Sequence, residues 1–71
     1  PESLQSLLLK QLDLESINTK DKEIVTELID HLDAKGYLST YPDLRDRLSQ
    51  SYDCDNRKID SCLKILQSFQ V

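Results

Sequence analysis

The residues best suited to chemistry lie together near the middle of the sequence, around the single histidine. Asp30 and Asp33 flank His31, and a carboxylate pair beside a proton carrier is one requirement of acid–base catalysis. At helical spacing, however, the two aspartates fall on the solvent-facing side, whereas His31 falls at the edge of the apolar side. No glycine-rich phosphate loop and no nucleophile motif accompanies these residues in the sequence. We therefore expect a protein that is not an enzyme, with no catalytic residues.

Residues 31–42, with the sequence HLDAKGYLSTYP, can be aligned with an EF-hand calcium loop if Gly36 takes the sixth position. The first, fifth and closing ligand positions are then occupied by His31, Lys35 and Pro42. Three oxygen ligands are lost and a positive charge is gained. The alignment therefore predicts no calcium binding, and a degenerate, non-calcium-binding EF-hand-like interaction domain is kept as an alternative function.

The two cysteines do not suggest a metal site or a disulfide framework. Cys54 and Cys62 lie eight residues apart, without a CxxC motif and with only one histidine in the chain. A tetrahedral zinc site needs four ligands, and small secreted scaffolds carry a much denser cysteine pattern. We expect reduced thiols, no metal and no cofactor.

The elements that carry these residues are predicted to be helices, and the chain is organised around the stretch of residues 23–38, which contains most of one helix and the turn that ends it. Its apolar residues recur at helical spacing and share one face: Ile24, Val25, Leu28, Ile29 and Leu32. Gly36, the only glycine, is expected to end this helix at positive φ. Tyr37 and Leu38 should then fold back onto the apolar face.

The same periodicity predicts helices at about 3–13, 20–35, 42–49 and 56–69, joined by short loops. Ser3, Asn18 or Thr19, Thr40 and Asp55 are the residue types that cap helix N-termini. The expected fold is all-α, a small four-helix bundle in which residues 1–71 form a single subdomain.

Two features do not fit a closed bundle. Gln11 falls within the apolar arc of the first helix, so its amide should need a hydrogen-bond partner, which the turn at 13–18 would provide. Ile65 and Phe69 widen the apolar face of the last helix beyond what so small a bundle needs. Such a surplus is typical of a surface that is covered by a partner or by further chain.

Charge and hydropathy narrow the choice of partner. The chain has 13 acidic and 9 basic residues, and its net charge of −4 disfavours binding to phosphates. Residues 39–69 can still be read as a helix-turn-helix DNA-binding module, with Arg57, Lys58 and Lys64 on its last helix, and this is the second alternative function. No apolar run approaches the length that spans a membrane.

The string LIDHLDAKGYL at residues 28–38 resembles the signature of the core-binding domain of sigma-54 (RpoN type) RNA polymerase sigma factors. Weaker similarities occur in the family's order at residues 8–12, 17–22 and 66–69. The motif positions that carry the resemblance are Gln11, Leu28, Ile29, Leu32, Gly36, Tyr37 and Leu38.

The resemblance implies the first helical subdomain of a bacterial, cytoplasmic transcription initiation factor that binds core RNA polymerase. Asp30 and Asp33 would then complement basic patches on the polymerase. Ile65 and Phe69 would pack against the polymerase or against a second helical subdomain, which follows in family members and is absent here. Promoter DNA would be contacted only through other domains of the full protein.

Overall fold

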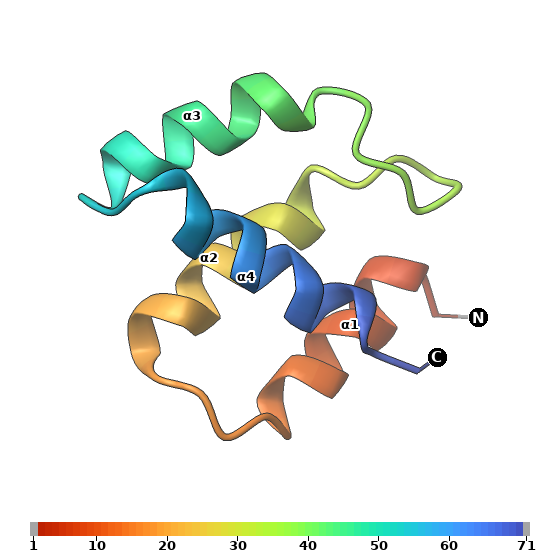
Figure 1. The fold of residues 1–71 in the computed structure, drawn as a ribbon. Helices are drawn as coiled ribbons and strands as arrows, with labels where there is room; N and C mark the ends of the chain where they lie inside the picture. The colour runs from red at the N-terminus through yellow and green to blue at the C-terminus, as the bar shows by residue number, and fades with distance from the viewer. Residues whose placement is uncertain (1, 71) are drawn as a thin grey trace.

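A computed structural model describes residues 2–70 of the chain, which form four helices and no strand. The helices are α1 (Leu4–Asp13), α2 (Thr19–Asp30), α3 (Tyr41–Ser51) and α4 (Asn56–Gln67) (Figure 1). The predicted all-α fold of four helices is therefore confirmed, although the connection between α2 and α3, residues 31–40, is longer than predicted.

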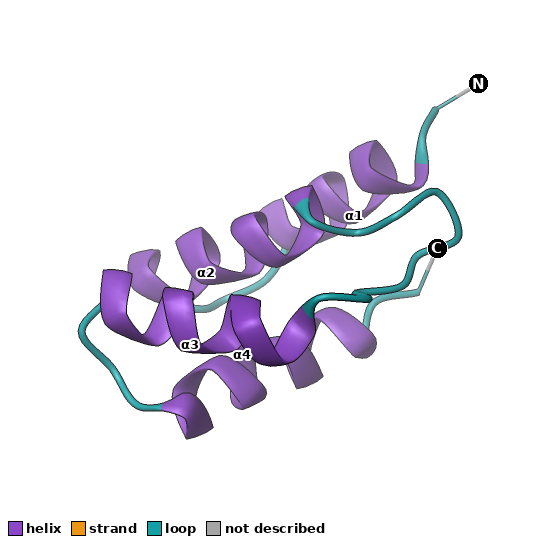
Figure 2. Ribbon diagram, turned by 90° about the horizontal axis from the view of Figure 1, so that it is seen from above, coloured by secondary structure: helices purple, strands orange, loops and turns teal. Residues whose placement is uncertain are grey.

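Helices α2 and α4 form the centre of the molecule. They pack on each other, α1 covers α2, and α3 packs on α4 (Figure 2). The core side chains with less than 2 % of their surface exposed come from α2, α3 and α4: Ile24, Val25, Leu28, Ile29, Leu44, Ile59 and Cys62. The apolar face predicted for residues 24–29 is thus the face that the core buries.

Three helices begin at the predicted capping residues. The side chains of Ser3, Asn18 and Asp55 each accept a hydrogen bond from the backbone N–H three residues later, which satisfies one of the free donors of the first turn. Thr40 lies at the start of α3, but its backbone (φ −108°, ψ 22°) is outside the extended region that a capping side chain needs, and its hydroxyl makes no cap bond. Pro42 in the first turn of α3 supplies a fixed helical φ instead.

The prediction for α2 was wrong in its length. The helix was expected to continue to Lys35, but it ends at Asp30. The Asp33 carboxylate accepts the backbone N–H groups of Lys35 and Tyr37, at 2.8 and 2.9 Å, and this local arrangement replaces the helical backbone bonds. Gly36 has the predicted positive φ, +86°, but within this turn and not as the helix cap.

The ends of the last two helices were misjudged by two residues. Helix α3 extends to Ser51, two residues beyond its predicted end, and α4 ends at Gln67, so that Phe69 follows the helix. Helix ends fray, and boundaries of this kind are poorly fixed by periodicity alone.

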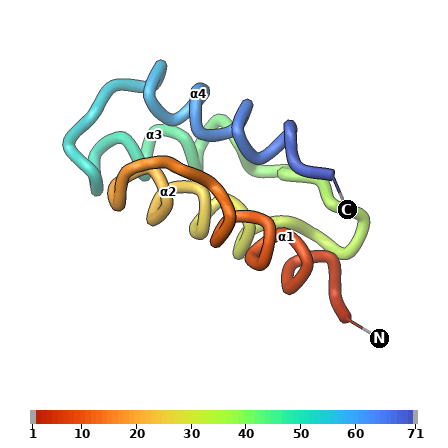
Figure 3. Tube along the Cα trace, turned by 90° about the horizontal axis from the view of Figure 1, so that it is seen from below, coloured from red at the N-terminus to blue at the C-terminus, as the bar shows by residue number. Residues whose placement is uncertain are grey.

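The start of α1, the end of α4 and the loop of residues 31–40 lie at the same end of the molecule (Figure 3). We refer to this part of the surface as the loop end. It contains Gly36 at positive φ and the predicted site residues Asp33 and Phe69, and Asp30 lies beside it at the end of α2.

Candidate protein-docking site

The two aspartates proposed for partner binding are both exposed, but they differ in what they do within the fold. Asp30 is the last residue of α2, and no ion pair of residues 2–70 involves it. Asp33 lies in the following loop, where its carboxylate holds the turn described above. Asp30 therefore offers a free charge, whereas Asp33 combines its charge with a structural role.

The apolar residues proposed for partner binding are less exposed than expected. Ile65 and Phe69 are half-buried and pack against the core of the chain itself. The large apolar side chains that are most exposed are instead Leu7 at 39 %, Tyr37 at 67 % and Leu14 at 78 %. The surplus apolar surface thus lies on α1 and on the loop end more than on α4. Tyr37 in particular does not fold back onto the core as predicted, whereas its neighbour Leu38 does.

A groove with a volume of about 470 Å³ opens at the loop end. Leucines of α1 and α4 line its walls, and the loop residues Lys35, Gly36 and Tyr37 lie along one side. Most of the lining is therefore apolar. The groove brings together residues that are more than 50 positions apart, so neither helix periodicity nor any motif could have located it.

Gln5 is a residue whose role the sequence did not suggest. Its side-chain amide donates to the backbone carbonyls of Ile29 and Leu32, at 3.3 and 3.2 Å. These carbonyls lie at and just after the end of α2, whose last turn carries no basic residue. The last carbonyls of a helix without a nearby basic side chain need other hydrogen-bond donors. The absence of a basic residue from the last turn of α2 was therefore the sign in the sequence that another side chain would supply them.

The side chain of Gln11, which was predicted to bond to the turn at 13–18, does not do so. No side-chain hydrogen bond of Gln11 occurs among residues 2–70. The turn after α1 is closed by the backbone, where the N–H groups of Leu14 and Glu15 donate to the carbonyls of Gln11 and Leu12. The half-buried position of Gln11 leaves its amide accessible to water.

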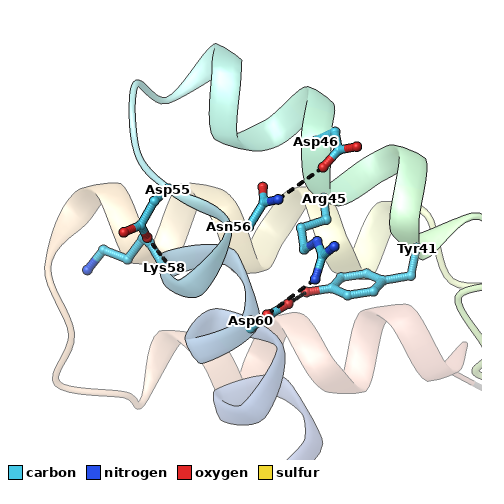
Figure 4. A network of polar contacts seen from close by, with 7 residues as sticks. All are labelled: Tyr41, Arg45, Asp46, Asp55, Asn56, Lys58 and Asp60. Atoms are coloured by element: carbon cyan, nitrogen blue, oxygen red, sulfur yellow. Dashed lines mark hydrogen bonds and ion pairs between the residues drawn. The ribbon is translucent and has the colours of Figure 1, made fainter.

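A polar network joins α3 to α4 (Figure 4). The Tyr41 hydroxyl donates to Asp60 at 2.6 Å, and Arg45 lies 3.4 Å from the other oxygen of the same carboxylate. This donated hydrogen bond holds the pKa of Asp60 below its usual value, while burial and the same bond raise the pKa of Tyr41. Asn56 adds a bond to Asp46 at 3.1 Å. The network fixes the angle between two helices and presents no converging reactive groups.

Most of the positive charge of α4 is neutralised within the chain. Arg57 lies 3.4 Å from Asp55, and Lys58 lies 2.9 Å from Asp21. Two of the three basic residues on which the helix-turn-helix interpretation depends thus have acidic neighbours. This arrangement favours a mixed-charge surface over a phosphate-binding one.

The cysteines show no sign of a reactive thiol. Both are unpaired, and burial raises the pKa of Cys62 to about 11, so that its thiol stays protonated at neutral pH. Within residues 2–70, no cluster of histidine, cysteine and acidic side chains has the composition to hold a metal ion. None of the helices described is long and apolar enough to span a membrane.

Comparison with protein families identifies the kind of domain to which this fold belongs. The family described as sigma-54 factor, core binding domain, matches residues 1–70. The chain belongs to this family. The sigma-54 core-binding domain family is regulatory and non-catalytic, and membership supports a fragment of a sigma-54 transcription initiation factor that binds core RNA polymerase. The resemblance seen in the sequence is thereby confirmed.

No curated protein and no solved structure matches the chain. The residues of this sigma-54 core-binding domain that contact the polymerase must therefore be argued from its own surface.

Proposed function

We propose that residues 1–71 form the first helical subdomain through which a sigma-54 type factor docks on core RNA polymerase. The function requires a stable surface of defined shape and charge, and no bond is made or broken. The observation that carries the proposal is the position of Asp30: it is exposed and forms no ion pair within residues 2–70, on a domain with a net charge of −4 and beside the loop end.

The docking surface would join the acidic end of α2 to the loop end. Asp30 and Asp33 complement a basic patch on the polymerase, because opposite charges speed the encounter of two proteins and fix their relative orientation.

Ile65 and Phe69 are proposed as the apolar part of the contact. Both are half-buried by the core, and the remaining surface would pack against the polymerase or against a second helical subdomain of the same factor. Promoter DNA would be bound through other domains of the full protein.

The proposal is tested by measuring the binding of purified core RNA polymerase to the immobilised chain. Asp30→Lys should weaken binding about twofold to fivefold, mainly through a slower association rate that depends on salt. Asp33→Asn should weaken it less, because asparagine removes the charge but keeps a side-chain oxygen that can hold the turn.

Asp13→Lys is the matched control. Asp13 is exposed and is the last residue of α1, as Asp30 is the last residue of α2, and both substitutions change the net charge equally. Equal effects of the two variants, or no effect of Asp30→Lys, would contradict a docking role for this acidic surface. Salt-dependent binding of the chain to promoter DNA would favour the helix-turn-helix alternative instead.

A further inference from the structure

We propose that the groove at the loop end is a second docking site, next to the acidic surface of Asp30 and Asp33. It would receive a short segment of a partner protein with large apolar side chains and a single carboxylate beside them.

The shape and lining of the groove suit apolar side chains. Its volume of about 470 Å³ lies within the range of pockets that bind small ligands or side chains. Leu4 of α1 and Leu63 of α4 line the groove and are only half-buried, so apolar surface remains uncovered. Burying such surface under a partner is favourable in proportion to its area.

Tyr37 at the edge of the groove has the properties of an anchor residue. Its side chain is 67 % exposed, and tyrosine is a residue type that contributes strongly to the binding energy of interfaces. Its backbone is fixed on both sides, because its N–H donates to the Asp33 carboxylate and its carbonyl accepts the N–H of Asp33 at 3.0 Å. Gly36 precedes it at φ +86°. A preorganised aromatic residue of this kind loses little conformational entropy on binding.

The charge around the groove specifies the chemistry of the partner. Lys35 is the single charged residue among those that line the groove, and no acidic side chain of residues 2–70 forms an ion pair with it. One carboxylate on the partner would complement Lys35. A run of acidic residues would be repelled by the net charge of −4, and a basic segment would meet Lys35 with the same sign. The charges therefore favour an apolar segment with one acidic residue.

The experiment is a selection of random 12-residue peptides on the immobilised chain, followed by affinity measurements with the peptides that are enriched. We expect peptides in which large apolar residues flank one aspartate or glutamate. Binding should shift the NMR signal of Gly36, which is the single glycine of the chain and needs no further assignment by residue type.

Two substitutions and two controls locate the binding. Tyr37→Ala should lower the affinity about thirtyfold, as loss of an interface anchor does, and Lys35→Gln about fivefold or less, as loss of an exposed ion pair does. Leu14→Ala and Lys20→Gln are the controls, because each changes an exposed apolar or basic residue outside the groove. Leu14 is 78 % exposed, and Lys20 is exposed on α2. Both controls should leave the affinity unchanged.

The proposal is overturned if no peptide is enriched, if the enriched peptides lack an acidic residue, or if Tyr37→Ala and Lys35→Gln bind as tightly as the unmodified chain. Dimers in sedimentation equilibrium that Tyr37→Ala dissociates would assign the groove to a second copy of the chain instead. Because the substituted side chains are exposed, circular dichroism should show unchanged helicity, and Lys35→Gln decides the matter if Tyr37→Ala does not fold.

Discussion

Two regions of the molecule are built in different ways: the contact of α2 with α4, and the loop end. Between the two helices, Leu28, Ile29 and Ile59 have no exposed surface and pack against one another, and the ion pair of Lys58 with Asp21 adds a polar contact. At the loop end, the backbone is held by individual polar contacts of Gln5 and Asp33 and by one glycine at positive φ, around a groove that stays open. The helix contact thus provides stability, and the loop end provides surface for a partner.

The largest effect should come from truncating the helix contact. Leu28→Ala removes a side chain with 0 % exposure and should lower the free energy of unfolding by about 2 to 5 kcal/mol, measured by urea denaturation. A core of this size rarely supplies more than about 3 to 5 kcal/mol, so the variant should be largely unfolded. Leu14→Ala, at 78 % exposure, should change stability by no more than about 0.5 kcal/mol. Similar losses in both variants would refute the contrast between core and surface.

The next effect should come from the backbone of the loop end. Gly36→Val should destabilise the fold by about 1 to 3 kcal/mol, because a β-branched residue is strained at φ +86°. A Cβ atom would also lie 3.0 Å from Cδ2 of Leu4, which is the flexible end of that side chain. Gly36→Asn adds the same Cβ atom but tolerates positive φ better. The difference in the midpoint of urea unfolding between the two variants therefore isolates the backbone strain, and equal midpoints would show that crowding against Leu4 dominates.

A smaller effect is expected from the amide that ties α1 to the end of α2. Gln5→Ala removes two hydrogen bonds to backbone carbonyls and should cost about 1 kcal/mol. Gln50→Ala is the control, because Gln50 is an exposed residue of α3. Urea denaturation gives the difference in stability, and NMR shifts of residues 33–37 should change in the Gln5 variant alone. Unchanged shifts there would mean that the loop holds its shape without α1.

The smallest effect concerns the acid dependence of the network between α3 and α4. The pKa of Asp60 is lowered in the folded state, chiefly by the hydrogen bond from Tyr41, so the ionised carboxylate contributes stability above its ordinary pKa of about 4. That contribution is lost as the pH falls through the lowered pKa. Tyr41→Phe should raise the Asp60 pKa in a carboxyl ¹³C titration, and its stability should fall less than that of the unmodified chain on acidification. Tyr52→Phe should leave the Asp60 pKa unchanged, and a shift there would argue against a specific role of Tyr41.

Predictions from the sequence succeeded where a local rule was sufficient. The apolar residues of α2 are buried, Ser3, Asn18 and Asp55 cap their helices, and Gly36 has positive φ. Each of these depends on the spacing or the conformational preference of a residue and its near neighbours. The length of α2 failed because apolar spacing continues to Leu32, whereas the Asp33 side chain competes for the backbone N–H groups beyond it.

The candidate site was predicted only in part, since exposure and contact depend on which segments meet. The sequence proposed Asp30 and Asp33 for partner binding, and both side chains are exposed. It placed the surplus apolar surface on Ile65 and Phe69, but those side chains pack partly against the core, while Tyr37 stays exposed. Periodicity describes one helix at a time and cannot show how much of its face the neighbouring helices cover.

The sequence by itself determined the helical class, the buried face of α2 and the family, because these follow from residue spacing and from an eleven-residue signature. The tertiary structure alone decided that Gln5, and not Gln11, supplies the side-chain amide contact to backbone carbonyls, and that Leu4 and Leu63 line a groove beside Tyr37. These features join residues that are distant in the chain, and only the packing of α1, α4 and the loop end brings them within contact distance.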